Sequence, residues 1–242
     1  IVIPASLKKI GIDYEVNGEN LGLSTHDFYN FGAKAGKFEA FEVEEENENF
    51  VAVDGVLYSK DKKRMLLYPR NKKGDTYEIL EGVVTIDELS FASNMNLENL
   101  IVPDSLTLEP RKQGIRSKNV CVLTSALYSY TSIKNIIIKD SNLNYTSIDG
   151  VVYTKDLKEL VYVAAGRTNE VIIPDGVETI RSYSTFSSQV GRKVSKMYIP
   201  NSVINIADIE IELLNNGFIR KIEVAEDNPA FTLDGNGKLV RK

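Results

Sequence analysis

The side chains best suited to acid–base or nucleophilic chemistry are scarce in this chain of 242 residues. It has one histidine, His26, one cysteine, Cys121, and no tryptophan. A nucleophilic site would need these two residues to meet, yet Cys121 lies in an apolar run at 120–123, which favours a buried and inert thiol. A zinc site of four cysteines, or of two cysteines and two histidines, cannot form within one such chain. We therefore predict that the protein is not an enzyme and has no catalytic and no metal-binding residues.

Two short segments are similar to ligand-binding loops, and both depart from the pattern that the chemistry needs. Segment 32–37 has three residues between its glycines instead of the four of a phosphate-binding loop, and Phe38 follows it where Ser or Thr is required. Segment 140–144 has the Asp-x-Asn-x-Asn spacing that opens a calcium loop, but Tyr145 follows where glycine is needed. A similar Glu-x-Asn-x-Asn spacing at 45–49 indicates a repeated turn. No cofactor is predicted.

The charge balance argues against nucleic acid as a partner. The chain has 29 Lys and Arg against 34 Asp and Glu, for a net charge of −5 and a pI near 5.2, whereas phosphate binding needs clustered positive charge. No apolar run approaches the roughly 18 residues of a membrane-spanning helix. Because the chain begins at Ile1 instead of methionine, we expect the signal peptide of a secreted protein to lie outside this sequence.

The strongest pattern in the sequence is an internal repeat, so the candidate functional residues are positioned by a repeated fold. Segment 50–61 recurs at 145–156, with the Asp-Gly-Val of each copy 95 residues apart. Segment 80–86 recurs at 174–180, and a third copy begins at Ile222. The repeats predict one solenoid domain, 1–242, with large modules at about 38–132 and 133–218 and partial modules at both ends.

A smaller unit, Ile/Val-Pro-x-Ser-Leu/Val or a close variant, recurs within the modules at 3–7, 102–106 and 199–203. The spacings between equivalent strand positions are 23, 26, 36 and 40 residues, and the shorter ones match a leucine-rich repeat, in which each unit is a strand with a return segment. The longer ones indicate loops inserted on one side of the coil. We predict a mainly β leucine-rich-repeat solenoid with parallel strands on the concave face and short helical or irregular returns.

Two Asp-Gly pairs predict β-hairpins in addition to the strands of the solenoid. Asp54-Gly55 and Asp149-Gly150 are each flanked by alternating apolar residues, which predicts β-hairpins at about Val51–Tyr58 and Ile148–Tyr153. A second bend is expected at 60–63 and at its counterpart. The pairs Val83/Ile86 and Val177/Ile180 should turn back into the core, with Phe91 and Phe186 filling it from the far side.

The combined phrases resemble the BspA-like leucine-rich-repeat proteins of bacterial cell surfaces. The phrases are Ile-Pro-x-Ser-Leu/Val, an Ile followed by a Phe, and Asn-x-x-Phe/Tyr before Asp-Gly-Val-Leu/Val-Tyr, and together they cover nearly the whole chain. The usual Ala-Phe pair is missing at Phe91 and Phe186, and segments 11–37 and 107–131 fit no phrase. The resemblance implies a right-handed solenoid that is secreted or bound to the cell surface and mediates adhesion or protein binding without catalysis.

The outward column of the strands, on the concave face, is the predicted binding site for a protein ligand on the surface of a host or neighbouring cell. If Leu100 and Val102 face the core, Ile101 faces solvent, because side chains alternate along a strand. The same register exposes one residue on each neighbouring strand: Val2, Glu42, Glu78, Ile137, Ile172, Tyr198 and Glu223. The predicted site is an apolar stripe, Ile101, Ile137, Ile172 and Tyr198, bordered by Glu78 and Glu223.

Other readings of the same residues stay open. β-branched residues are good strand formers whether or not they bind anything, and an inserted loop can cover the stripe. Acidic segment 42–48 is most simply a solvated face beside a strand. A carbohydrate-binding module, with Tyr198 and other tyrosines as stacking platforms, and a structural spacer of a larger surface protein are alternatives to protein binding.

Overall fold

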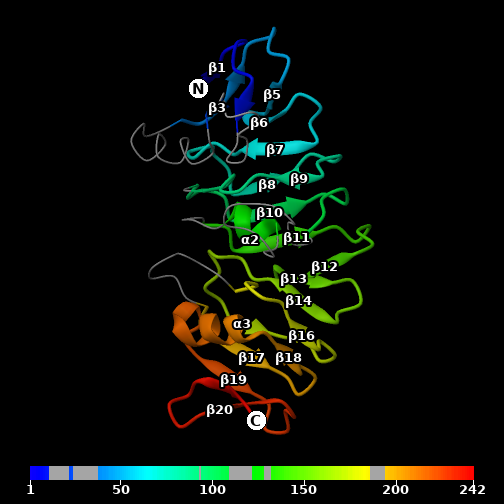
Figure 1. Ribbon diagram of the computed structural model, residues 1–242, viewed down its shortest axis with the longest axis vertical. Coiled ribbons are helices and arrows are strands. Elements are labelled where there is room, and N and C mark those ends of the chain that lie inside the picture. Colours follow the sequence, from blue (N-terminus) through cyan, green and yellow to red (C-terminus); the bar gives the residue numbers. More distant parts are fainter. Residues whose placement is uncertain (11–21, 24–37, 93, 109–121, 128–131, 186–193) are drawn as a thin grey trace, which may run out of the picture.

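The computed structural model describes residues 1–10, 22–23, 38–92, 94–108, 122–127, 132–185 and 194–242. These residues form a mainly β protein with little helix, whose elements follow one another down the long axis from the amino to the carboxyl end (Figure 1). His26, Cys121, segment 32–37 and Phe186 lie outside the described residues, so the predictions that involve them stay predictions.

Short parallel strands form a first ladder in three pieces. Val102 pairs with Ile138 and Ile3 with Val43, so the predicted spacings of 36 and 40 residues are strand registers. Leu100 and Val102 are fully buried while Ile101 is half-buried, which confirms the predicted alternation. The strands are β1 (Val2–Ile3) with β4 (Glu42–Val43), then β8 (Thr76–Glu78), β10 (Asn99–Val102) and β11 (Asn135–Ile138), then β15 (Val171–Ile172), β17 (Met197–Ile199) and β19 (Ile222–Val224).

Both predicted hairpins are present, and each continues into a third strand after the predicted second bend. Asp54 and Gly55 have φ of 49° and 72°, and Asp149 and Gly150 have 49° and 77°. A positive φ at both turn residues matches the right-handed twist of the paired strands and favours Asp-Gly. The three-stranded units are β5 (Phe50–Val53), β6 (Val56–Ser59) and β7 (Arg64–Leu67), and β12 (Tyr145–Ile148), β13 (Val151–Thr154) and β14 (Glu159–Tyr162).

Each of these two hairpins interrupts the first ladder, because its turn packs against the ladder strand before it. The carbonyl of Gly55 accepts the N–H of Phe41 at 2.8 Å, and the carbonyl of Gly150 accepts the N–H of Ile136 at 3.1 Å. A Cβ on Gly150 would lie 2.8 Å from the Cα of Asn135. Glycine is therefore required there for its close approach as well as for its positive φ.

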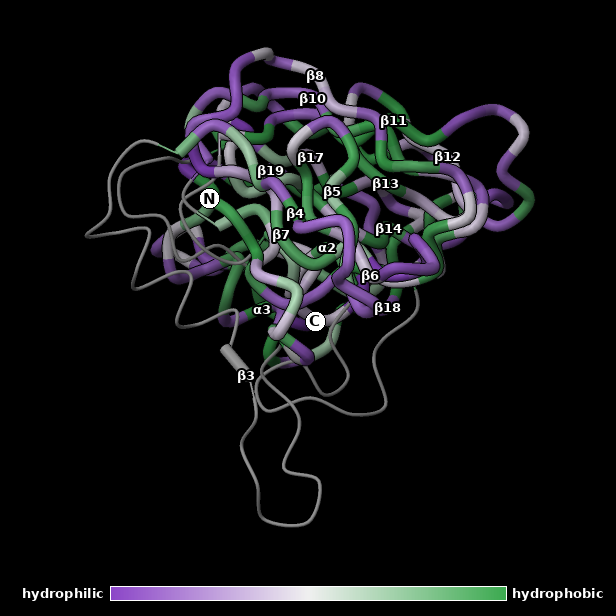
Figure 2. Tube along the Cα trace, turned by 90° about the horizontal axis from the view of Figure 1, so that it is seen from above, coloured by the Kyte–Doolittle hydropathy of each residue, from purple (hydrophilic) through white to green (hydrophobic). Residues whose placement is uncertain are grey.

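A second ladder, which the sequence did not predict, follows the third strand of each unit. β7 pairs in parallel with β9 (Thr85–Ile86), and β14 pairs with β16 (Thr179–Ile180), which pairs with β18 (Asn205–Ile206). The returns expected to be irregular are thus short strands, although they do bury the predicted Val83, Ile86, Val177 and Ile180. Viewed along the long axis, β8 and β10 lie on one side of the molecule and β14 and β18 on another (Figure 2).

Four buried asparagines organise equivalent turns, and we call them the bracketing asparagines: Asn47, Asn94, Asn142 and Asn228. Asn47, Asn94 and Asn228 also bond to the preceding repeat. Each side-chain oxygen accepts the backbone N–H groups of the residues two and three positions later. The Nδ2 of Asn94 donates to the carbonyls of Pro69 and Arg70, and that of Asn228 to those of Pro200 and Val203. Segments 45–49 and 140–144 are therefore repeated turns, as their spacing indicated.

The third module ends differently from the first two. Its hairpin pairs β20 (Phe231–Leu233) with β21 (Leu239–Arg241), and Asn215 brackets the outer edge by accepting the N–H of Leu239 at 2.8 Å and donating to its carbonyl at 2.9 Å. The side chain of Asn215 thus bonds to β21 in the third module, whereas β7 pairs with β6 and β14 pairs with β13 in the other two. The remaining elements are β2 (Lys9–Ile10), β3 (Gly22–Leu23), α2 (Val122–Ala126), α3 (Asp208–Leu213) and the π-helical η1 (Leu214–Phe218).

Glu210 of α3 is a fully buried carboxyl. Its Oε1 accepts hydrogen bonds from the Ser184 hydroxyl at 3.0 Å and from the Thr185 hydroxyl at 2.6 Å and N–H at 3.0 Å. Among the described residues its Oε2 has no hydrogen-bond partner. Burial is the main effect and raises the pKa of Glu210, because a charged carboxylate is poorly solvated there.

Replacing Glu210 with glutamine should therefore stabilise the protein increasingly as the pH rises. Because the pKa of Glu210 is raised on folding, the folded protein holds this proton more tightly than the unfolded chain does. The free energy of unfolding therefore falls as the pH rises above the unfolded-state pKa of about 4.3. The loss is up to ~1.4 kcal/mol per pH unit and ends at the folded-state pKa. Urea unfolding of both proteins from pH 4 to pH 8 measures the difference. Glu212→Gln, an exposed change on the same helix, is the control. A pH-independent difference for Glu210→Gln would contradict the explanation.

Candidate binding surface

The six predicted site residues fall into two rows of three. Ile101 is the register partner of both Glu78 and Ile137 in the first row. In the second row the register partners of Tyr198 are Ile172 and Glu223. Ile137 and Ile172 are 39% and 58% exposed, whereas Ile101 and Tyr198 are half-buried. Val2, 58% exposed, pairs with Glu42 in the amino-terminal piece, apart from both rows.

The two rows are not adjacent, because β11 and β15 belong to different sheets and the β12–β13 hairpin stands between them. That hairpin supplies Ile148, 37% exposed, which lines the same pocket as Ile172 and Asn135. Ile172 of the second row therefore shares a pocket with a hairpin residue that the strand pattern did not indicate. The sequence signal for Ile148 was an apolar residue directly before the Asp149-Gly150 turn. The strand pattern assigned this residue to the hairpin and not to the binding face.

The two acidic residues at the ends of the rows are paired within the chain. Glu78 binds Lys139 at 2.5 Å, and this hydrogen bond raises the pKa of the lysine. Glu223 binds Lys221 at 2.6 Å, which lowers the pKa of the carboxyl, and lies 3.7 Å from Lys196. Exposed pairs of this kind contribute little stability, but they neutralise the carboxylates. The predicted acidic border is thus a border of ion pairs.

A polar column runs beside the first row on the same face. The amide of Asn135 donates to the side-chain oxygen of Asn99 at 2.8 Å, and the amide of Asn99 donates to the Thr76 hydroxyl at 3.3 Å. Each of these residues precedes a residue of the first row by two positions. Because side chains alternate along a strand, the two sets lie on the same face. The face therefore offers hydrogen-bonding groups next to exposed isoleucines.

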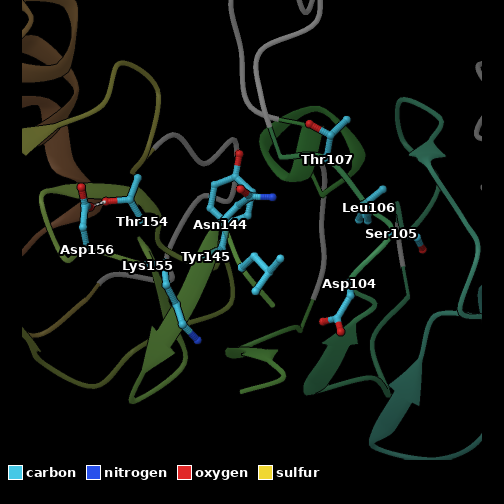
Figure 3. Close-up of a pocket in the computed structure, with 10 residues that line it drawn as sticks. Asp104, Ser105, Leu106, Thr107, Asn144, Tyr145, Thr154, Lys155 and Asp156 are labelled. Atoms are coloured by element: carbon cyan, nitrogen blue, oxygen red, sulfur yellow. Dashed lines mark hydrogen bonds between the residues drawn. The ribbon is translucent and has the colours of Figure 1, made fainter. Parts of the chain in front are cut away.

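A separate polar pocket of about 550 Å³ lies between the segment that follows β10 and the region where β12 begins and β13 ends (Figure 3). Asp156 accepts a hydrogen bond from the Thr154 hydroxyl at 2.7 Å, which lowers the pKa of the carboxyl. Leu143, 86% exposed, stands at the same pocket. The remaining lining residues are Asp104, Ser105, Leu106, Thr107, Asn144, Tyr145 and Lys155. Hydroxyl, amide and carboxylate groups in an open pocket can bind a hydroxylated ligand such as a sugar.

Most of the described tyrosines serve the core. Six of them are buried: Tyr58, Tyr68, Tyr77, Tyr145, Tyr153 and Tyr162. Tyr183 and Tyr198 are partly exposed. A tyrosine ring must be exposed on one face to stack on a sugar, so in the described part of the chain only these last two can serve as the platforms that a carbohydrate-binding module needs.

Groups for metal chemistry do not gather in the described ranges, where no cluster of three or more His, Cys, Asp or Glu side chains is placed to hold an ion. No described helix has both the length and the apolar composition that crossing a membrane requires.

No family model and no curated protein matches the chain. Three solved structures are similar to it. They are the pneumococcal vaccine antigen PcpA (17% identity, 93% of this chain and 55% of that chain, TM-score 0.44), a leucine-rich-repeat protein from Eubacterium ventriosum (19%, 77% and 54%, 0.46) and a leucine-rich cell-surface protein from Faecalibacterium prausnitzii (20%, 77% and 41%, 0.43). The chain thus spans about half the length of these structures. Similarity at this level does not assign a function.

Proposed function

We propose that the chain is a leucine-rich-repeat solenoid of a bacterial surface or secreted protein, without catalytic activity, that binds a protein partner through the outward face of its first ladder. The observation that supports this function best is the exposed apolar set Ile137, Ile148 and Ile172, which spans the junction of two ladder pieces beside a polar column. Exposed apolar surface rimmed by polar groups is typical of interaction sites.

A pull-down from solubilised host-cell surface and matrix proteins should capture a specific partner, which is then purified for direct binding measurements. The double substitution Ile137→Asp/Ile172→Asp should weaken that binding by at least about tenfold, because a charge is placed in each apolar contact. Circular dichroism establishes that the variant folds.

The matched control is Val84→Asp/Ile204→Asp. These two residues are 44% and 45% exposed and stand next to strands of the second ladder, β9 and β18. Unchanged binding in the control and loss in the first variant would support the proposed face. Equal binding by both variants would reject it.

Glycan binding is the second candidate, and the polar pocket of Figure 3 is the observation that favours it. A glycan array separates the two: binding that Asp104→Ala abolishes and Ile137→Asp/Ile172→Asp leaves intact would favour the pocket over the ladder face. If the chain binds neither protein nor glycan, a structural spacer is the remaining candidate function.

A further inference from the structure

The pocket at the junction between β11 and β15 has a buried cation in its wall. This junction pocket has a volume of about 610 Å³. Arg167 is 7% exposed, and it donates from Nη1 to the carbonyl of Asp149 and from Nη2 to the carbonyl of Glu170 at 2.9 Å. Within the described part of the chain, its buried Nε has no hydrogen-bond acceptor. Ile148 and Ile172 also line the pocket.

The first module shows what Arg167 lacks. Lys72 occupies the equivalent position, 95 residues earlier, and its Nζ donates to the carbonyl of Asp54 at 2.8 Å. Lys72 also pairs with the carboxylate of Asp54 at 2.9 Å. In the described residues, Arg167 makes the equivalent contact with the Asp149 carbonyl but no ion pair with a carboxylate.

A buried guanidinium that is hydrogen-bonded to no carboxylate is costly, because backbone carbonyls replace only part of its hydration. The charge of the nearby Asp149 carboxylate offsets part of this cost. Desolvation lowers the pKa of Arg167, although the group stays charged. A ligand carboxylate is the natural complement, since guanidinium binds it through paired, charge-assisted hydrogen bonds. The exposed side chains of Ile148 and Ile172 make the neighbouring wall apolar, which suits an aliphatic group on the same ligand.

We propose that the junction pocket binds the C-terminal carboxylate of a protein partner whose last residue is aliphatic, with Arg167 pairing with the carboxylate and Ile148 and Ile172 contacting the side chain. This inference rests on the proposed function, because it names the group by which the partner is recognised. Two acidic residues also line the pocket. Glu170 is paired with Lys196 at 3.1 Å, and Asp149 is exposed, so its charge repels an anionic ligand.

The probe is N-acetyl-leucine, titrated into the protein and followed by NMR at the Nε–Hε resonance of Arg167. We expect a saturable shift, and N-acetyl-leucinamide, which lacks the charge, should bind at least about tenfold more weakly. Equal binding of acid and amide would overturn the inference. Tighter binding of 4-methylpentanoate, which has no peptide group, would overturn the peptide C-terminus as the source and indicate a free short-chain acid.

Two variants make the test specific. Arg167→Lys keeps a cation that fits this position, as Lys72 shows, but replaces the planar guanidinium, which can pair with both oxygens of a carboxylate, by a single ammonium group. It should therefore weaken binding of N-acetyl-leucine by about tenfold. Asp149→Asn removes the opposing charge and preserves the turn, because Asn-Gly favours the same positive-φ conformation, so it should strengthen binding severalfold. Wild-type affinity in both folded variants would overturn the inference.

The two proposals can fail separately. N-acetyl-leucine binding without any protein partner would leave the junction pocket standing and reject the protein-binding face. A partner that is lost on Ile137→Asp/Ile172→Asp, together with no binding of N-acetyl-leucine, would support the face and reject the pocket.

Discussion

Replacing Asn94 with alanine is expected to lower the free energy of unfolding by about 3–5 kcal/mol, because it leaves several buried backbone groups without partners, each costing roughly 1–3 kcal/mol. The lost bonds are those from Nδ2 to the carbonyls of Pro69 and Arg70, at 2.9 and 3.0 Å, and those to Oδ1 from the N–H groups of Asn96 and Leu97, at 3.1 and 2.8 Å. Urea unfolding measures the change.

The control is Asn96→Ala, two residues away. Asn96 is exposed, and its side chain donates one hydrogen bond, to the carbonyl of Lys72 at 3.2 Å. Its loss should cost less than about 1 kcal/mol. Asn94→Asp keeps the shape but replaces the two donors with an acceptor, so it should destabilise at neutral pH as strongly as alanine does. A small effect of both Asn94 variants would show that Asn94 does not hold the neighbouring repeats together.

The strand registers and hairpins could be predicted because their signals are local. Leu100 and Val102 alternate with outward residues over a few positions, and Asp149-Gly150 specifies a turn by its own backbone preferences. Once a strand phrase recurs, stacking places its copies side by side, so the spacing of 36 residues between Val102 and Ile138 is also their register.

The interruption of the ladder could not be predicted from those local signals. Nothing around Ile137 or Ile172 records that the β12–β13 turn packs against Asn135 and separates their strands, because this contact joins residues of different segments. The same holds for Asn215, whose side chain takes the place of a third strand beside Leu239. The predicted single stripe is therefore divided into two rows, because the β12–β13 hairpin separates the strands that carry them, and its role in binding stays a prediction.

Gly150→Ala should cost about 3 kcal/mol or more, since the substitution adds a steric conflict to an unfavourable backbone conformation. The new Cβ would lie 2.5 Å from the Asn135 Oδ1 and 2.8 Å from its Cα, and φ is already +77°. The turn would have to move away from β11, opening the junction between the ladder pieces and displacing the Asp149 carbonyl that Arg167 binds.

Gly176→Ala separates the two contributions, because Gly176 also has a positive φ, +95°, but a Cβ there meets nothing within 4 Å. This control should cost only the backbone strain, about 1–2 kcal/mol. Urea unfolding compares the two variants. If Gly150→Ala were no more destabilising than Gly176→Ala, the hairpin turn would not be held tightly against the ladder, and the junction between its pieces would have to be formed by other contacts.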